Sequence, residues 1–230
     1  MIIGSGLLAQ AFTPAFIHRD DVCIYAAGVS NSGCNEVLEF VRERERLTDA
    51  LLQAEHVSAF VYFGTCSVVD PEMQHTPHVK HKLEMENVVR KHPQNLILRL
   101  PQVAGKTPNP HTLLNFLYAR ISQGKSFNLW SKAKRNIIDV VDVEIIAKQL
   151  IENNSTRNKI INIANIASYE MVAIVAVMEH IVGRRAVYNV VEYGSDYCID
   201  TGEMLEVLEK VNVKFGGDYL EKIITKYYRC

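Results

Sequence analysis

The amino-acid sequence predicts an α/β fold in which a parallel β-sheet carries helices on both faces, followed by a smaller C-terminal α/β lobe. Three observations predict it. Short, continuously apolar runs alternate with helix-like segments in the first half, as expected for strands buried on both faces. A glycine-rich turn follows the first run, and the second half changes to shorter strands and more helices. Within 230 residues we expect a core at 1–105, and a return to that core with the smaller lobe at 106–230.

The elements of the first half follow from apolar runs and helical periodicity. Strands are predicted at 1–4, 21–28, 57–64 and 95–100. Helices are predicted between them at 7–17, 35–55 and 77–91. We expect Pro14 to break the first helix, whereas Pro77 suits the first turn of the third helix.

The predicted helix over 35–55 is amphipathic. Its charged run RERER, residues 42–46, is expected to be a solvated face. Its apolar side chains lie mostly on one face and are Val37, Leu38, Val41, Leu47, Leu51 and Leu52.

The second half predicts a mixed lobe. Helices are expected at 111–124, 142–153, 168–182, 201–210 and 217–228, and shorter strands near 137–141, 160–164 and 187–192. The terminal segment YLEKIITKYYRC is amphipathic and is expected to pack on this lobe.

Composition indicates a globular cytosolic protein. The chain is 48% hydrophobic and 22% charged, and its net charge of −1 does not favour nucleic-acid binding, which needs a basic face. Five cysteines without C-x-x-C spacing indicate reduced thiols. No apolar run approaches the ~20 residues of a membrane helix, so we expect no membrane partner.

The start of the chain carries a glycine motif. GSGLLA fits G-x-G-x-x-A at Gly4, Gly6 and Ala9, after a strand and at the opening of a helix. Gly4 permits a tight turn, Gly6 lets the backbone approach a pyrophosphate, and the helix N-terminus favours the anion. The alternative is a tight turn before a core helix. The expected cofactor contacts here are Gly4, Ser5, Gly6, Leu7 and Leu8.

One part of a Rossmann dinucleotide site is missing. Such sites carry an acid about 20 residues on, at the tip of the second strand, to bind the ribose hydroxyls. Here that strand ends in YAAG, and Asp20 and Asp21 precede it. His18 and Arg19 could approach a 2′-phosphate and favour NADP, or be ordinary loop charges.

Several segments in order resemble the extended short-chain dehydrogenase/reductases, the NAD-dependent sugar-nucleotide epimerase/dehydratase family. The matching segments, which span nearly the whole chain, are IYAAGVS, VYFGTCSVVD, PHVKHK, LRLPQVAG, RNIIDVVDV and INIANIASYEMVAIVAVMEHIVG. The resemblance implies NAD or NADP as cofactor and a nucleotide sugar as substrate. It places Ala26, Ala27 and Gly28 on the nicotinamide side of the cofactor.

The chain is a shortened and divergent example of this pattern. A strand–helix–strand unit that the family has between the first helix and YAAG is missing. We therefore expect a sheet with fewer strands and a more open adenosine pocket.

The resemblance also implies the catalytic residues. The family's Y-x-x-x-K carries a general acid/base Tyr and a Lys that binds the nicotinamide ribose; here these positions hold His78 and Lys82. Thr65 matches the hydroxyl that orients the substrate oxygen. Imidazole has a pKa of ~6.5 and can exchange protons near neutral pH, and a nearby Lys82 would keep it neutral. The alternative is that His78 marks lost catalysis.

His75, His78 and His81 are spaced by three, which is compatible with a metal site or with a polar helix face. Because no Asp, Glu or Cys completes a ligand set, we expect no metal.

Three further residues are candidates for substrate binding. The resemblance places Arg135 on the substrate diphosphate, which suits a planar guanidinium, although a surface Arg beside Lys132 and Lys134 is the alternative. It places Gln102 where many members have an Asn near the substrate. Asn31, with Ser32, could line the same cleft or cap the following helix.

Two function classes follow. The first is an NAD(P)-dependent sugar-nucleotide epimerase, reductase or dehydratase, concerned with surface-polysaccharide precursors such as O-antigen or capsule. The second is a catalytically impaired nucleotide- or sugar-binding regulatory protein on the same fold. By analogy with the family, the helices over 35–55 and 77–91 would form a homodimer interface.

Overall fold

The computed structural model describes residues 1–229 and contains a five-stranded parallel sheet. Its strand order is β1-β2-β3-β4-β8, and every neighbouring pair is parallel. The strands are β1 (Ile2–Ile3), β2 (Val22–Tyr25), β3 (Ala59–Thr65), β4 (Asn95–Leu100) and β8 (Lys159–Asn162). The predicted parallel sheet is thus confirmed, and β8 joins it from the second half of the chain.

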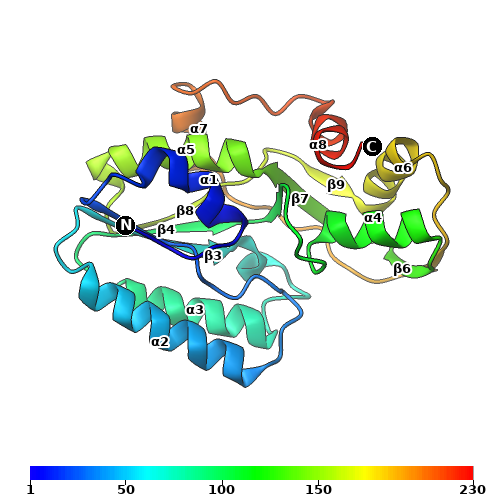
Figure 1. Cartoon of the computed structure of the whole chain (residues 1–230). Coiled ribbons are helices and arrows are strands. Elements are labelled where there is room, and N and C mark those ends of the chain that lie inside the picture. The colour runs from blue at the N-terminus through cyan, green and yellow to red at the C-terminus, as the bar shows by residue number, and fades with distance from the viewer. Residues whose placement is uncertain (230) are drawn as a thin grey trace.

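Helices cover both faces of this sheet (Figure 1). The helices α1 (Leu7–Phe16) and α5 (Val140–Glu152) pack on one face, where α7 (Gly202–Leu208) adds Met204 and Val207 to the core. The helices α2 (Val37–Gln53) and α3 (Pro77–Val89) pack on the other face, over Tyr62 and Ile97. Two single turns, η1 (Cys66–Val69) and η2 (Asn154–Thr156), complete this part.

The smaller C-terminal lobe has its own core. Its strands are β5 (Gln102–Ala104), β7 (Lys134–Asp139) and β9 (Ser168–Glu170) in one sheet, and β6 (Phe127–Trp130) with β10 (Tyr188–Val191) in another. Its helices are α4 (Leu113–Gln123), α6 (Met171–Val182) and α8 (Tyr219–Tyr228). They lie together at one end of the molecule (Figure 1). The apolar side of α8 is buried among them, which confirms that the terminal segment packs here.

The sheet has fewer strands than a complete dinucleotide-binding fold. The chain passes from α1 directly into β2, which pairs with β1, so β1 is an edge strand. This arrangement confirms the missing strand–helix–strand unit.

Three expectations about local structure are corrected. Pro14 lies inside α1 without breaking it, since it falls in the last turn, where only the hydrogen bond to Gln10 is lost. The strands β5, β6 and β9 are additional to the predicted ones, and β9 occupies the start of the helix predicted over 168–182, which begins only at Met171. The charged run on α2 is not wholly solvated, since Glu43 is 2% exposed whereas Leu38 is 75% exposed.

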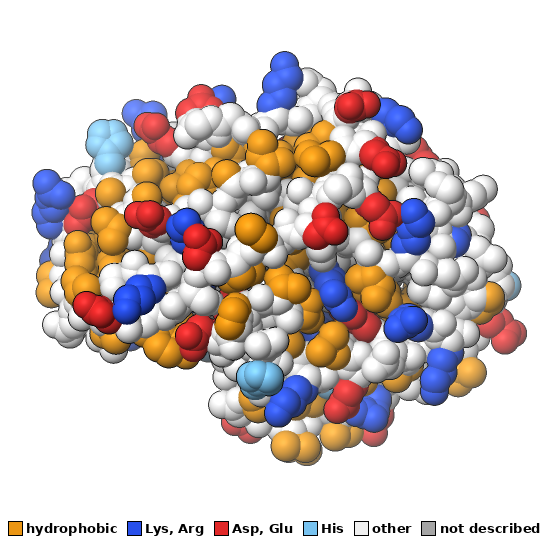
Figure 2. Space-filling view, turned by 180° about the vertical axis from the view of Figure 1, so that it is seen from behind, with side chains coloured by type: hydrophobic (Ala, Val, Ile, Leu, Met, Phe, Trp, Pro, Cys, Tyr) orange, Lys and Arg blue, Asp and Glu red, His pale blue; other side chains and the backbone are white. Residues whose placement is uncertain are grey.

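The surface in Figure 2 carries charges of both signs, and the described cysteines form no disulfide. Acidic and basic side chains are interspersed over the face seen in Figure 2. Cys23, Cys34, Cys66 and Cys198 are free thiols, and Cys230 lies outside the described residues. Within residues 1–229, no helix has the length and hydropathy to cross a membrane.

Candidate functional site

A cavity of about 630 Å³ opens at the carboxyl ends of β1 to β4. This is the edge at which open α/β sheets bind ligands. It brings together predicted residues from distant parts of the chain: Gly4, Ser5, Gly6, Leu7, Leu8, Ala26, Ala27, Gly28, Thr65, His78, Lys82 and Gln102. Two predicted residues, Asn31 and Arg135, do not line it.

The charge of this cavity is one-sided. Its lining within residues 1–229 contains the cationic side chains Arg46, Lys82 and Lys106, and no Asp or Glu. Neither Arg46, in the charged run over 42–46, nor Lys106 carries a local sequence signal that predicts its place in this cavity. A cavity lined by cations and no carboxylate favours an anionic ligand.

The two motif glycines have different roles. Gly4 has φ +132°, and a Cβ there would lie 2.5 Å from the carbonyl oxygen of Ala26, so the turn requires glycine. Gly6 is the extended N-cap of α1, and a Cβ there would meet nothing within 4 Å. No side chain caps α1 and its first turn carries no acid, so its first N–H groups remain for an anion.

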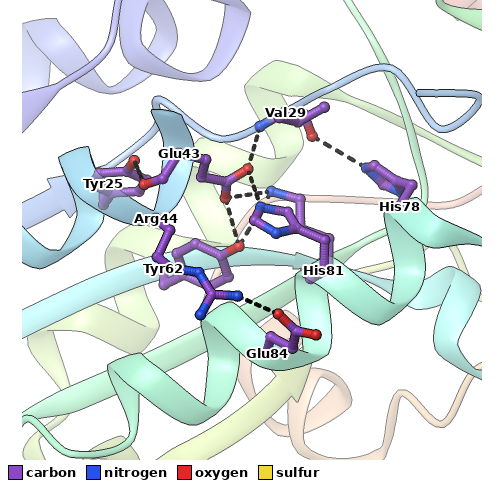
Figure 3. A network of polar contacts seen from close by, with 9 residues as sticks. Tyr25, Val29, Glu43, Arg44, Tyr62, His78, His81 and Glu84 are labelled. Carbon is purple, nitrogen blue, oxygen red and sulfur yellow. Dashed lines mark hydrogen bonds and ion pairs between the residues drawn. The ribbon is translucent and has the colours of Figure 1, made fainter. Parts of the chain in front are cut away.

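Lys82 is held by the buried carboxylate of Glu43, a residue that the sequence did not reveal and that Figure 3 shows. Its Nζ lies 3.1 Å from Glu43 Oε1 and 3.3 Å from the Tyr62 hydroxyl. The ammonium also lies against Gly28, where an added Cβ would come within 2.4 Å of it. Gly28 is therefore needed for Lys82 to sit at the cavity wall.

Glu43 is the centre of this buried network. Oε1 also accepts a hydrogen bond of 2.9 Å from the Tyr62 hydroxyl, and Oε2 accepts one of 2.6 Å from the Val29 N–H. His81 Nε2 lies 3.1 Å from Oε2, within ion-pair distance but without hydrogen-bond geometry. Burial alone would raise the pKa of Glu43; His81, Lys82 and the Val29 N–H outweigh it and hold that pKa well below its ordinary value.

His78, in the first turn of α3, lines the cavity on the same helix as Lys82. Its Nε2 lies 3.2 Å from the Val29 carbonyl oxygen, which can only accept, so Nε2 carries the proton. Its Nδ1 is buried and has no hydrogen-bond partner. Burial, helped by the charge of Lys82, lowers the pKa of His78 to about 4. In this arrangement neither ring nitrogen of His78 is therefore accessible to a ligand. His78 contacts the Val29 carbonyl whereas His81 contacts Glu43, so the two rings do not share a contact.

Thr65 ends β3 at the cavity. Its hydroxyl oxygen accepts a hydrogen bond of 3.1 Å from the Ser67 N–H, which caps η1. No hydrogen bond within residues 1–229 uses the Thr65 O–H as donor. Thr65 can therefore donate to an oxygen of a ligand.

Asn31, His18 and Arg19 lie away from the cavity lining. The side chain of Asn31 accepts from the Gly33 N–H and shapes the loop before α2, while neighbouring Ser32 does line the cavity. Arg19 pairs with Asp21 at 2.7 Å before β2 begins. The pair thus lies at the opposite end of that strand from the cavity.

A second cavity of about 570 Å³ lies in the smaller lobe and contains Arg135. The guanidinium lies 5.7 Å from the centre of the Trp130 ring, and Nη1 donates to the Lys134 carbonyl at 2.8 Å. Its Nη1 is 3.9 Å from the carboxylate of buried Asp70. Phe116, Phe127 and Arg120 also line this cavity, which combines aromatic faces with two guanidinium groups.

No protein-family model matches the chain, and no curated protein matches it in sequence. Solved structures match its fold. UDP-glucuronic acid 4-epimerase from Bacillus cereus, in complex with UDP-glucuronic acid and NAD, has a TM-score of 0.71 at 20% identity, covering 88% of this chain and 74% of that one. A dTDP-glucose 4,6-dehydratase from Bacillus anthracis with NAD has a TM-score of 0.70 at 14% identity, covering 94% and 75%. RMD from Pseudomonas aeruginosa with NADPH has a TM-score of 0.66 at 14% identity, covering 89% and 80%.

Proposed function

We propose that the protein is an NAD(P)-dependent enzyme that acts on a nucleotide sugar as an epimerase, reductase or dehydratase. The observation that carries the proposal is the cavity without carboxylates, in which the glycine turn of α1 meets Thr65, His78 and Lys82. Its fold is that of sugar-nucleotide epimerases and dehydratases solved with NAD, which supports the same chemistry. A cytoplasmic role in surface-polysaccharide precursor synthesis belongs to this proposal.

The residues present fit the cofactor. The N–H groups of the first turn of α1 would hold a phosphate, Gly6 leaves room for it, and Lys106 adds positive charge. Ala26 and Gly28 would face the nicotinamide, and Lys82 would bind its ribose. When bound, NAD(P) would supply hydride transfer to or from the sugar.

The substrate would lie across both cavities. Thr65 would donate its O–H to the reacting sugar oxygen, and Gln102 would contact the sugar. Arg135 would bind the diphosphate, with the base against the aromatic side chains of the second cavity. His78 can take a proton only at Nδ1, so catalysis requires its ring to turn from the Val29 carbonyl.

A homodimer is part of this proposal. The solvent-facing side of α2 carries apolar side chains that the monomer leaves exposed, namely Val37, Leu38, Val41 and Leu52, and Leu83 of α3 is 37% exposed. A second copy of the chain would cover them. Size-exclusion chromatography with light scattering tests this arrangement.

The second candidate function is a binding protein without catalysis. It is favoured by His78, whose Nε2 is bonded to the main chain and whose Nδ1 is buried. On this alternative the protein binds a nucleotide or a sugar as a regulator and transfers no hydride.

The two functions are separated by binding and turnover measured on the same protein. We expect NADH or NADPH to bind, and a panel of UDP-glucose, UDP-glucuronic acid and dTDP-glucose to yield a product visible by NMR. His78→Ala should then lower turnover by about 100-fold, the range of one general acid/base, with unchanged cofactor affinity. If the parent protein binds the ligands without turning them over, and His78→Tyr brings turnover back, the binding protein would be supported. Absence of binding at millimolar NADH and NADPH would end the proposal of an NAD(P)-dependent enzyme.

Gly6→Ala is expected to weaken NADH binding at least about tenfold, because its methyl group would occupy the place of the phosphate. The free energy of unfolding should change by no more than about 1 kcal/mol, since the methyl meets no protein atom. Calorimetric titration and urea unfolding measure the two quantities.

Gly4→Ala is the matched control for this substitution. It should destabilise the protein by about 2 kcal/mol, because φ +132° is strained for any other residue and the Cβ meets Ala26. Equal effects of the two substitutions on binding and on stability would contradict the assigned roles.

A further inference from the structure

The strand order of the main sheet bears on how much of the cofactor the protein can contact. Dinucleotide folds have two mononucleotide-binding halves, and the ligand lies across the point where the strand order reverses. Here the order β1-β2-β3-β4-β8 runs in one direction only. The described sheet therefore contains one half and no point of reversal.

In place of the missing half, a short connection joins α1 to β2 at the edge of the sheet. Only residues 17–21 separate α1 from β2. The terminal ammonium of Met1 donates to the carbonyls of Arg19 and Val22, at 2.9 and 2.6 Å, which fastens this short connection to the start of β1. No strand in residues 1–229 pairs with the outer edge of β1 to provide a floor for adenosine.

The carboxylate that binds the adenosine ribose in dinucleotide folds is absent from the described cavity lining. That lining contains no carboxylate within residues 1–229, and Asp21 pairs with Arg19 at the opposite end of β2. The side-chain amide of Gln10 donates to the Ser5 carbonyl at 3.0 Å. Arg46, on α2, is the cation that could still meet this end of a dinucleotide.

Groups for the other half of the cofactor are all present. The N-terminus of α1 and Gly6 suit one phosphate. Lys82, held in place by Glu43, lies beside Gly28, where it would meet the ribose. These groups belong to the strands that the sheet retains.

We propose that the cavity recognises the nicotinamide mononucleotide half of the cofactor, and that the adenosine half extends past edge strand β1 into solvent. This inference rests on the proposed function. It implies that reduced nicotinamide mononucleotide (NMNH) binds almost as well as NADH, since both present about two negative charges to the same helix N-terminus.

The test is calorimetric titration of the full chain with NADH, NMNH and NADPH. We expect the Kd for NMNH to be within about fivefold of that for NADH, and NADPH to be within about threefold of NADH. Gly6→Ala should raise the Kd for NADH and the Kd for NMNH by the same factor, because both ligands place a phosphate at the N-terminus of α1.

Two results would overturn the inference while leaving the proposed function intact. One is NADH binding more than about tenfold tighter than NMNH, which would mean that adenosine is recognised. The other is NADPH binding more than about tenfold tighter than NADH, with the difference lost in Arg46→Gln, which would place the adenosine ribose at Arg46. If neither NADH nor NMNH binds, the proposed function fails and the inference fails with it.

Discussion

Glu43→Gln is expected to lower the free energy of unfolding by about 3–5 kcal/mol, because it leaves the buried ammonium of Lys82 without a counter-charge. The amide keeps the shape of the carboxylate, so the loss reports charge rather than packing. The acceptors for Tyr62 and the Val29 N–H are also weakened. Urea unfolding of both proteins measures the difference.

The matched control is Glu45→Gln on the exposed side of the same helix, which should change stability by no more than about 0.5 kcal/mol. A double-mutant cycle with Lys82→Met isolates the pair. Removing Lys82 should cost less in the Glu43→Gln background than in the parent protein. A loss below about 1 kcal/mol for Glu43→Gln would contradict the network.

The same carboxylate predicts a response to acid. The folded pKa of Glu43 is depressed, so below about 4.3 the unfolded chain takes up a proton that the folded chain refuses. Stability from Glu43 is therefore complete above that pH and is lost as pH falls below it. Glu43→Gln should flatten this part of the curve.

His78 is expected to make the protein about 3 kcal/mol less stable at pH 4 than at pH 7, apart from the contributions of other groups. Its folded pKa is about 4, below the ~6.5 of the unfolded state. Between these values the unfolded chain binds a proton and the folded chain does not. The loss therefore accumulates as pH falls from about 6.5 to about 4 and then stops.

His78→Gln removes this contribution, so subtracting its stability curve from that of the parent isolates the window. His56→Gln, at an exposed site, is the matched control and should keep the slope of the parent. Equal slopes for the parent and His78→Gln between pH 4 and about 6.5 would show that the imidazole titrates normally. Urea midpoints at several pH values provide the measurement.

The prediction for His78 bears on the function. A ring that stays neutral to about pH 4 is no proton donor as imidazolium at pH 7. Proton exchange with a substrate would have to use the neutral ring through Nδ1. If the loss of stability between about pH 6.5 and about pH 4 is measured, turnover by the parent protein would require the ring to move. That result would favour the binding function.

Much of the fold and of the site could be predicted from the sequence, because the signals are local. Continuous apolar runs fix the parallel strands, and the spacing of Gly4 and Gly6 fixes a turn before a helix. Thr65 is the last residue of a strand, and Lys82 lies in a helix that begins at Pro77 near the same edge. Parallel strands end at one edge of a sheet, so these residues meet there whatever the packing elsewhere.

The tertiary structure alone decided the partner of Lys82. In the sequence Glu43 is one of five consecutive charges on an amphipathic helix, and nothing local separates it from Glu45. It is buried because α3 brings Lys82 and His81 within 3.1 Å of it, while Leu38 remains exposed. Whether a charged side chain can be buried depends on opposite charges supplied by another element, and that pairing is set by how two helices pack on a sheet, which neither helix encodes by itself.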